Sequence, residues 1–219
     1  MERFTVRIIS HRGYWRSRGE QNRRVAFERS LDLGFGIETD LRDDNRMVVI
    51  SHDPPPSAPD AVMTLDAFLA LCTGHGPGLT LALNIKADGL QTAVREALDR
   101  HGALGNAFVF DMSVPDTLGY LAVGVPVYVR HSDVEPEPVL YDRAAGVWLD
   151  QFHSDWIGPG DITRHLDAGK DVCLVSPELH RRDHRAQWER LAADPAVTGH
   201  SRFFLCTDFP EDAREFFHA

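Results

Sequence analysis

Two histidines, His11 and His52, bracket a pair of carboxylates, Glu38 and Asp40, early in the sequence, and Arg12 follows the first histidine directly. A histidine can donate or accept a proton near neutral pH, and an arginine fork binds phosphate oxygens. Paired carboxylates bind hard divalent cations. These residue types together could cleave a phosphodiester, and the rest of the sequence must supply the elements that position them.

Glu38 and Asp40 are two positions apart within an apolar run, so in a strand both side chains point to the same face. A buried carboxylate is costly unless it is compensated. One explanation is an ion pair with Arg12 or with Lys86. The other is a divalent cation, and an all-oxygen set of ligands suits Mg²⁺, Ca²⁺ or Mn²⁺ better than zinc. Such a cation would polarise a phosphoryl oxygen.

Short apolar runs alternate with helical patterns along the whole chain. The predicted strands are 5–10, 35–41 with a partner arm at 47–51, 80–86, 107–111, 125–129, 146–150, 171–175 and 203–207. The predicted helices are 24–33, 65–71, 90–101, 114–123, 162–168, 185–193 and 211–217. This order predicts an α/β protein, a single (β/α)8 barrel of the TIM type that occupies residues 1–219 as one domain. Because 219 residues are few for this barrel, we expect at least one helix to be reduced to a turn, and the helical pattern is weakest around 136–141.

Polar residues recur where the predicted strands end. In such barrels the reacting groups lie at the carboxyl ends of the strands, so we expect these residues to share a pocket. They are His11 and Arg12, Glu38 and Asp40, His52, Asn84 and Lys86, Asp111, Arg130 and His131, Asp150, Ser176 and Glu178, and Asp208.

The composition limits the partners of this protein. A net charge of −10 argues against a nucleic-acid surface, which requires clustered Lys and Arg. The three widely spaced cysteines indicate buried thiols in a reducing compartment, and no apolar run is long enough to span a bilayer. We therefore expect a cytoplasmic protein that acts on a small anionic molecule; its oligomeric state is not predictable.

Five short motifs in this order resemble the signature of the glycerophosphodiester phosphodiesterase family: His11-Arg12-Gly13, Asn22 with Ala26-Phe27, Glu38-x-Asp40, His52-Asp53 and Thr207-Asp208-Phe209-Pro210. The resemblance implies an α/β barrel that uses a divalent cation, Mg²⁺ or Ca²⁺, to hydrolyse a small phosphodiester to a phosphomonoester and an alcohol. It also implies that His11 and His52 are the acid–base pair. Arg12 and Lys86 would then contact the phosphate, and Glu38 and Asp40 would bind the cation.

Three departures from the family pattern predict an outlying member. The chain has Gln21-Asn22-Arg23 where the family usually has Glu-Asn-Thr, and Val175-Ser176-Pro177-Glu178 replaces an aromatic-rich strand. Asn84 stands where the family commonly has a third carboxylate. An amide oxygen can bind Mg²⁺ or Ca²⁺ but carries no charge, so the expected cation ligands are Glu38, Asp40 and Asn84 with Asp111 as the compensating acid and Asp88 behind it.

Two other functions remain open from the sequence. A metal-independent enzyme similar to the phosphatidylinositol-specific phospholipases C would use a basic side chain in place of the cation, and Asn84 favours it. A barrel that has lost turnover and only binds a phosphorylated ligand is the third alternative.

Overall fold

The computed structural model describes residues 6–55, 62–75 and 78–218. The chain divides into two compact units. Residues 10–127 form one of them, which we call the continuous unit. The residues up to Ile9 and those from Tyr128 onward form the other, which we call the split unit. Strand β1 (Arg7–His11) therefore begins in the split unit and ends in the continuous unit.

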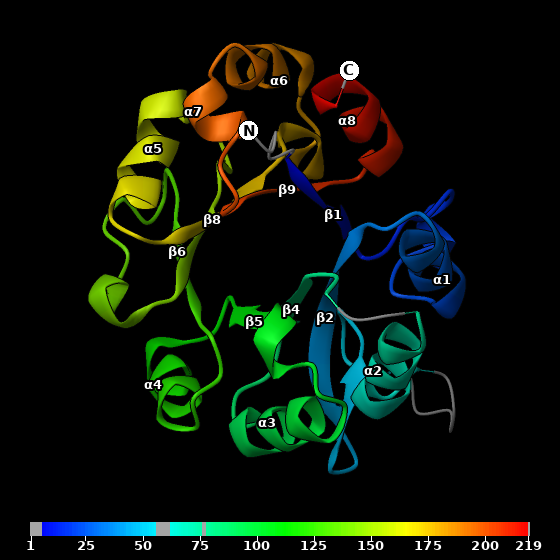
Figure 1. Cartoon of the computed structure of the whole chain (residues 1–219). Coiled ribbons are helices and arrows are strands. Elements are labelled where there is room, and N and C mark those ends of the chain that lie inside the picture. Colours follow the sequence, from blue (N-terminus) through cyan, green and yellow to red (C-terminus); the bar gives the residue numbers. More distant parts are fainter. Residues whose placement is uncertain (1–5, 56–61, 76–77, 219) are drawn as a thin grey trace. The chain divides into compact units, whose positions relative to one another are not determined.

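Parallel strands form the centre of the continuous unit. Strand β4 (Leu81–Ile85) lies between β2 (Gly36–Asp44) and β5 (Ala107–Phe110), and β3 (Met47–Ile50) runs antiparallel to β2. All five residues of β4 are buried, as expected for a parallel strand that is covered on both faces. Figure 1 shows the helices of this unit on one side of these strands. They are α1 (Arg24–Asp32), α2 (Leu65–Gly74), α3 (Gln91–Arg100) and α4 (Val114–Ala122), with the short 3₁₀ helices η1 (Arg18–Glu20) and η2 (Leu104–Asn106) between them.

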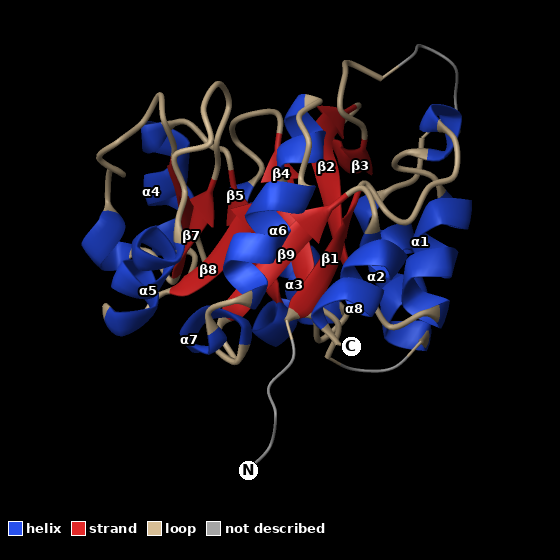
Figure 2. Ribbon diagram, turned by 90° about the horizontal axis from the view of Figure 1, so that it is seen from above, coloured by secondary structure: helices blue, strands red, loops and turns tan. Residues whose placement is uncertain are grey.

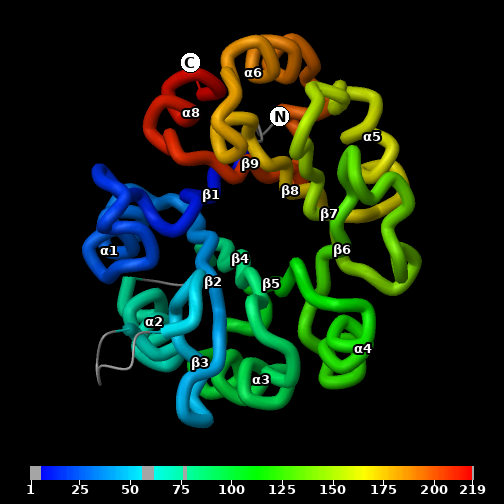
Figure 3. The backbone as a smooth tube through the Cα atoms, turned by 180° about the vertical axis from the view of Figure 1, so that it is seen from behind, coloured from blue at the N-terminus to red at the C-terminus, as the bar shows by residue number. Residues whose placement is uncertain are grey.

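The split unit repeats the same design. Its parallel strands pair in chain order and are β6 (Tyr128–His131), β7 (Gly146–Leu149), β8 (Asp171–Val175) and β9 (Phe203–Thr207). Its helices are α5 (Pro159–Asp167), α6 (Arg185–Ala192), α7 (Pro195–Thr198) and α8 (Pro210–Phe217), with the 3₁₀ helices η3 (Tyr141–Arg143) and η4 (Pro177–His180). Figure 2 distinguishes these helices (blue) from the strands (red), and the tube in Figure 3 follows each helix back to the next strand.

Local sequence signals explain several element boundaries. The Ser113 hydroxyl accepts a hydrogen bond from the backbone N–H of Asp116 at 3.3 Å and so caps α4. In the turn between β2 and β3, Asn45 and Arg46 have φ values of 47° and 68°. Two consecutive positive φ values match the twist of a two-residue β-hairpin. This turn directs β3 back along β2 and so carries His52 to the end of β2 that holds Asp40.

The predicted fold class is confirmed: the chain has an α/β fold in which eight parallel strands alternate with helices, as in a (β/α)8 barrel. Between β6 and β7 the chain forms only η3, so one helix is reduced to a turn as expected. The strand predicted at 125–129 is observed as β6, because Val127 makes only an isolated bridge to Val109. Helix α7 was not predicted, and residue 5 of the first predicted strand lies outside the described residues. The single-domain assignment stays a prediction.

No helix in the described part of the chain combines the length and the apolar character that a bilayer crossing requires.

Candidate active site

The turn after β1 holds His11 and Arg12 in place. Arg12 has φ 57° and Gly13 has φ 78°, so the chain reverses sharply at this point. A Cβ atom on Gly13 would lie 2.9 Å from the Cβ atom of Ala26, so glycine lets α1 pack directly against the turn. The indole N–H of Trp15 donates a hydrogen bond to the carbonyl oxygen of His11 at 3.1 Å. These contacts fix the backbone that carries both functional side chains.

Glu38 lies in the middle of β2 and is 1% exposed. Its Oε2 atom accepts a hydrogen bond from the backbone N–H of Arg12 at 3.0 Å, and Nε2 of His11 lies 3.9 Å from the same oxygen. Burial, and then the negative charge of Asp40, raise the pKa of Glu38 to about 7, while His11, Arg12 and Lys86 act in the opposite direction. The carboxyl group of Glu38 therefore needs additional positive charge to stay ionised.

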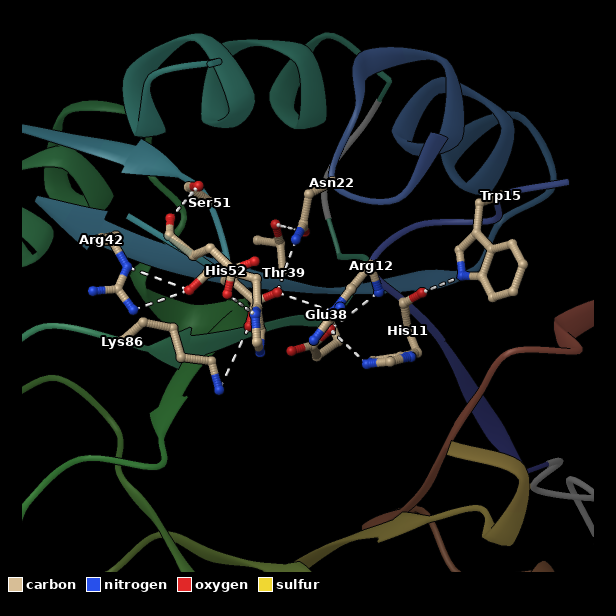
Figure 4. A network of polar contacts seen from close by, with 12 residues as sticks. His11, Arg12, Trp15, Asn22, Glu38, Thr39, Arg42, Ser51, His52 and Lys86 are labelled. Carbon is tan, nitrogen blue, oxygen red and sulfur yellow. Dashed lines mark hydrogen bonds and ion pairs between the residues drawn. The ribbon is translucent and has the colours of Figure 1, made fainter. Parts of the chain in front are cut away.

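Asp40 is fully buried two positions further along β2, on the same face as Glu38. Its Oδ2 atom accepts a hydrogen bond from Nδ2 of Asn22 at 2.8 Å and lies 3.0 Å from Nε of Arg12 (Figure 4). Its Oδ1 atom lies 3.6 Å from Nζ of Lys86, which is an ion-pair distance too long for a hydrogen bond. One oxygen of Asp40 thus has a hydrogen-bond donor, and the other has none among the described residues.

The neighbouring strand β4 places a second unsatisfied oxygen beside Asp40. Asn84 is paired in register with Asp40, so their side chains leave the sheet on the same face. Within the described part of the chain, Oδ1 of Asn84 and Oδ1 of Asp40 are buried without a hydrogen-bond partner. Two residues after Asn84, Lys86 reaches back to Asp40 and also lies 3.5 Å from Oδ2 of Asp111.

Asp111 follows β5 directly, in a left-handed conformation with φ 72°. Its contact with Lys86 continues a series of ion pairs in which positive and negative side chains alternate. The members of this series are Arg12, Asp40, Lys86 and Asp111. The prediction of Asp111 as a cation ligand is not tested by this contact. The contact does give its carboxylate a second possible role, which is to hold Lys86.

His52 follows β3 by two residues, and 45% of its side chain is exposed. Nδ1 of its ring lies 2.9 Å from Oδ1 of Asp53, so the neighbouring carboxylate can fix the ring with Nδ1 protonated. The guanidinium group of Arg42, on β2, donates hydrogen bonds to the carbonyl oxygen of His52 at 3.3 and 3.0 Å. Figure 4 shows His52 in the same group of residues as His11 and Lys86.

These residues fit a divalent cation of the magnesium type. Among the described residues, no three side chains of His, Cys, Asp and Glu come together as a metal-binding group. Glu38, Asp40 and Asn84 nevertheless supply two carboxylates and an amide on one face, and two of their oxygens lack a hydrogen-bond donor. Burial and the neighbouring charge of Asp40 raise the pKa of Glu38, so the group can accept further positive charge.

Three residues contact the candidate site although the sequence prediction gave them no role in it. Asn22 belongs to one of the sequence motifs, but its contact with Asp40 was not predicted. Thr39 points to the opposite face of β2, where its hydroxyl donates to Oδ1 of Asn22 at 2.8 Å. Trp15 fixes His11 through the backbone. Thr39 could have been found from the sequence, because it is a polar residue between two functional carboxylates. Trp15 could not, because no sequence pattern indicates it.

Polar residues at the strand ends of the split unit form networks of their own. Nε2 of His180 lies 2.6 Å from Oδ1 of Asp150, and the carboxylate of Glu178 accepts the backbone N–H of Asp208 at 3.1 Å. His131 turns toward helix α5, where its Nδ1 lies 3.0 Å from Nε2 of His165. Other residues join these networks: the hydroxyls of Ser176 and Thr207 bond Glu178, and the hydroxyl of Tyr141 lies 2.8 Å from Nδ1 of His165.

No family model matches the sequence, and no curated protein matches it. Solved structures do share the fold. A glycerophosphodiester phosphodiesterase from Parabacteroides distasonis has a TM-score of 0.70 and 18% identity, with 99% of this chain and 98% of that chain covered. The chain has the fold of the glycerophosphodiester phosphodiesterases.

Two further structures extend this likeness. The glycerophosphodiester phosphodiesterase from Agrobacterium tumefaciens has a TM-score of 0.70 and 18% identity, covering 98% of this chain and 100% of that chain. A phosphodiesterase from Oleispira antarctica, solved with its product sn-glycerol-3-phosphate, has a TM-score of 0.68 and 16% identity, with 99% and 98% coverage. The glycerophosphodiester phosphodiesterase fold therefore spans almost the whole of this chain.

Proposed function

We propose that this protein is a phosphoric diester hydrolase that cleaves a small glycerophosphodiester-like substrate to a phosphomonoester and an alcohol. One observation carries the proposal: the buried carboxylates of Glu38 and Asp40, on the part of β2 that pairs with β4, lie beside two fixed cations, Arg12 and Lys86. The shared fold supports it, since the three solved structures compared above are phosphodiesterases.

Arg12 and Lys86 are suited to hold the non-bridging oxygens of the phosphate. Both side chains are about one-fifth exposed, so each can contact Asp40 and still reach a bound ligand. The planar guanidinium group of Arg12 can bind two oxygens at once, whereas the ammonium group of Lys86 acts as a point charge. Together they would align the phosphorus atom for attack.

Glu38, Asp40 and Asn84 would hold a divalent cation, Mg²⁺ or Ca²⁺. When bound, this cation would neutralise the charge that develops on the phosphoryl oxygens. Its charge would also favour the ionised form of Glu38, whose pKa is raised by burial. Asp111 would stay at the edge of the group, where it contacts Lys86.

His11 and His52 would move the protons of the reaction. His52 is the more exposed of the two, and its contact with Asp53 favours protonation at Nδ1 and leaves Nε2 to accept or donate a proton. Nε2 of His11 lies 3.9 Å from Oε2 of Glu38, so His11 stands beside the proposed cation ligands. One histidine would protonate the departing alcohol while the other removes a proton from the attacking hydroxyl group or water.

The test is hydrolysis of a panel of glycerophosphodiesters and one aryl phosphodiester by the purified protein with Mg²⁺ or Ca²⁺. We expect turnover by the native protein and its loss in His11→Ala and His52→Ala. His101→Ala is the matched control, because His101 pairs with Asp66 on α2, away from the motifs. Full activity in both active-site variants would refute the assigned roles, and no turnover by the native protein on any diester would refute the function.

A metal-independent reaction is the second candidate, and one observation favours it. Arg12 and Lys86 both pair with Asp40, so the site already holds two positive charges. The raised pKa of buried Glu38 argues the other way, because a further positive charge would stabilise its ionised form. Activity that survives exhaustive chelation would select the metal-independent reaction.

A further inference from the structure

Asn22 makes three separate contacts with the residues of the candidate site. Its backbone N–H donates to the carbonyl oxygen of Arg12 at 3.0 Å. Its Nδ2 donates to Oδ2 of Asp40 at 2.8 Å, and its Oδ1 accepts the hydroxyl of Thr39 at 2.8 Å. The backbone and side chain of this one residue therefore link the turn after β1 to two consecutive residues of β2.

The hydroxyl of Thr39 determines which way the amide of Asn22 points. A carboxylate can only accept hydrogen bonds, so the atom of Asn22 that faces Asp40 must be the amide nitrogen. The Thr39 hydroxyl then meets the amide oxygen and donates to it. Because Thr39 is fully buried, this hydroxyl has no competing water, and the orientation of the amide is fixed from both sides.

The contact with Asn22 makes the two oxygens of Asp40 different. Oδ2 accepts a hydrogen bond from Asn22 and lies 3.0 Å from Nε of Arg12. Oδ1 has no hydrogen-bond donor among the described residues and lies 3.6 Å from Nζ of Lys86. Oδ1 is therefore the oxygen better able to bind a cation, and Asn84, in register on β4, offers a second oxygen without a donor. Without the Asn22 amide the carboxylate of Asp40 could rotate, and its two oxygens could exchange positions.

We propose that Asn22 is a positioning residue that fixes the carboxylate of Asp40 so that Oδ1, together with Oδ1 of Asn84, binds the divalent cation, and that Thr39 acts through Asn22. This inference rests on the proposed function only for the presence of the cation. Neither Asn22 nor Thr39 contacts the substrate in this assignment.

The backbone of Asn22 suggests the right variant. Asn22 has φ 57°, a left-handed conformation that glycine adopts freely and alanine does not. Asn22→Gly therefore removes the amide without straining the turn. Asn45 provides a matched control, because it has φ 47° in the exposed hairpin turn between β2 and β3.

The experiment is titration calorimetry of Mg²⁺ alone into the native protein and four variants, with thermal unfolding measured in parallel. We expect the dissociation constant for Mg²⁺ to rise at least about tenfold in Asn22→Gly, as for other residues that orient metal ligands, and about threefold in Thr39→Val. The double variant Asn22→Gly/Thr39→Val should have the same dissociation constant as Asn22→Gly, because the Thr39 hydroxyl orients Asp40 only through the Asn22 amide. Asn45→Gly should bind Mg²⁺ as the native protein does.

A purely structural role for Asn22 would lower the melting temperature but leave the dissociation constant within twofold of the native value, and that result would overturn the proposal. So would additive losses in the double variant, or a native protein that binds no Mg²⁺. The inference is separable from the proposed function: a native protein that binds Mg²⁺ through Asn22-dependent geometry but hydrolyses no diester would refute only the function.

Discussion

Two buried polar groups in this molecule differ in how completely they are satisfied. In the continuous unit, Glu38 and Asp40 lie among fixed cations, and one carboxylate oxygen is left without a hydrogen bond among the described residues. In the split unit, His131, His165 and Tyr141 form a hydrogen-bonded row with distances of 3.0 and 2.8 Å. An incomplete charged group indicates a place for a ligand, whereas a complete neutral group indicates a structural role.

The same physical cause acts on both groups with opposite sign. Burial disfavours the charged form, so it raises the pKa of Glu38 to about 7 and lowers the pKa of His165 to about 4. Burial also lowers the pKa of His131. The histidines are stable as neutral rings that bond to each other. The carboxylates are next to Arg12 and Lys86, which favour the charged form.

The largest expected effect is on the rate of the proposed reaction. His11→Ala should lower kcat about 10³-fold, since a positioned acid–base group contributes between about 10² and 10⁴. Its stability should fall less than that of a variant at buried His165, because 18% of the His11 side chain is exposed. Steady-state kinetics and urea unfolding of the same sample measure both quantities. A variant that loses stability but keeps its rate would place His11 with the structural group.

For the split unit we expect the opposite result, a loss of stability without a loss of rate. His165→Ala should destabilise the protein by about 2–4 kcal/mol, because it leaves a cavity and removes the partner of both His131 and Tyr141. The rate per folded molecule should be retained. Urea unfolding monitored by tryptophan fluorescence gives the free energy of unfolding. If kcat fell with stability unchanged, the histidine row would belong to the chemistry, and the comparison would fail.

The two groups should also respond to pH in opposite directions. The ordinary pKa of histidine is 6.5, so between pH 6.5 and about 4 the unfolded state binds more protons than buried His165 does, and stability falls as pH falls. For Glu38, with an ordinary pKa of 4.5, the folded state binds the proton first between pH 7 and 4.5, and stability rises as pH falls. Both contributions act in the same acidic range.

The midpoints of urea unfolding at pH 7.5, 6.0 and 5.0 separate the contribution of His165 from that of Glu38. Relative to the native protein, His165→Ala should lose less stability on acidification, because the destabilising histidine is gone. Glu38→Gln should lose more, because the opposing carboxyl is gone. Equal slopes in all three proteins would show that neither group has the altered pKa that burial imposes.

The smallest effect is expected at the edge of the charged group. Asp111→Asn keeps a residue that tolerates φ 72° and removes one charge beside Lys86, where both side chains are about one-fifth exposed. The cost in stability should be about 0.5–1 kcal/mol. The dissociation constant for Mg²⁺ should change less than threefold if Asp111 only holds Lys86. A loss of affinity above tenfold would instead make Asp111 a ligand, as the sequence predicted.

Period and spacing were sufficient to predict the strands and the pairing of the carboxylates. Glu38 and Asp40 share a face because β2 alternates, and Asn84 joins them because β4 pairs with β2 in register. These relations depend only on regular backbone geometry. Strand period therefore predicted that Glu38 and Asp40 share a face, whereas Asn84 was placed beside them by the resemblance to the family.

Relations that depend on loops or on strand phase were not predictable. Asn22 reaches Asp40 only because Arg12 and Asn22 both adopt left-handed conformations, which short sequence patterns do not specify. Arg130 and His131 both end β6, and a prediction that groups them at the strand end cannot tell which one faces helix α5. The structure turns His131 to the helix side, where it meets His165.

The division of the chain has a consequence for its biosynthesis. Residues 10–127 are contiguous, so a ribosome completes the continuous unit before it has made any strand from β6 onward. The split unit cannot be complete until residue 218 has been made, because Nε2 of His218 lies 3.0 Å from the carbonyl oxygen of Val6. Domains generally fold as units in the order of their synthesis. The residues proposed for catalysis would then be assembled on the nascent chain, while β1 still lacks its split-unit partners.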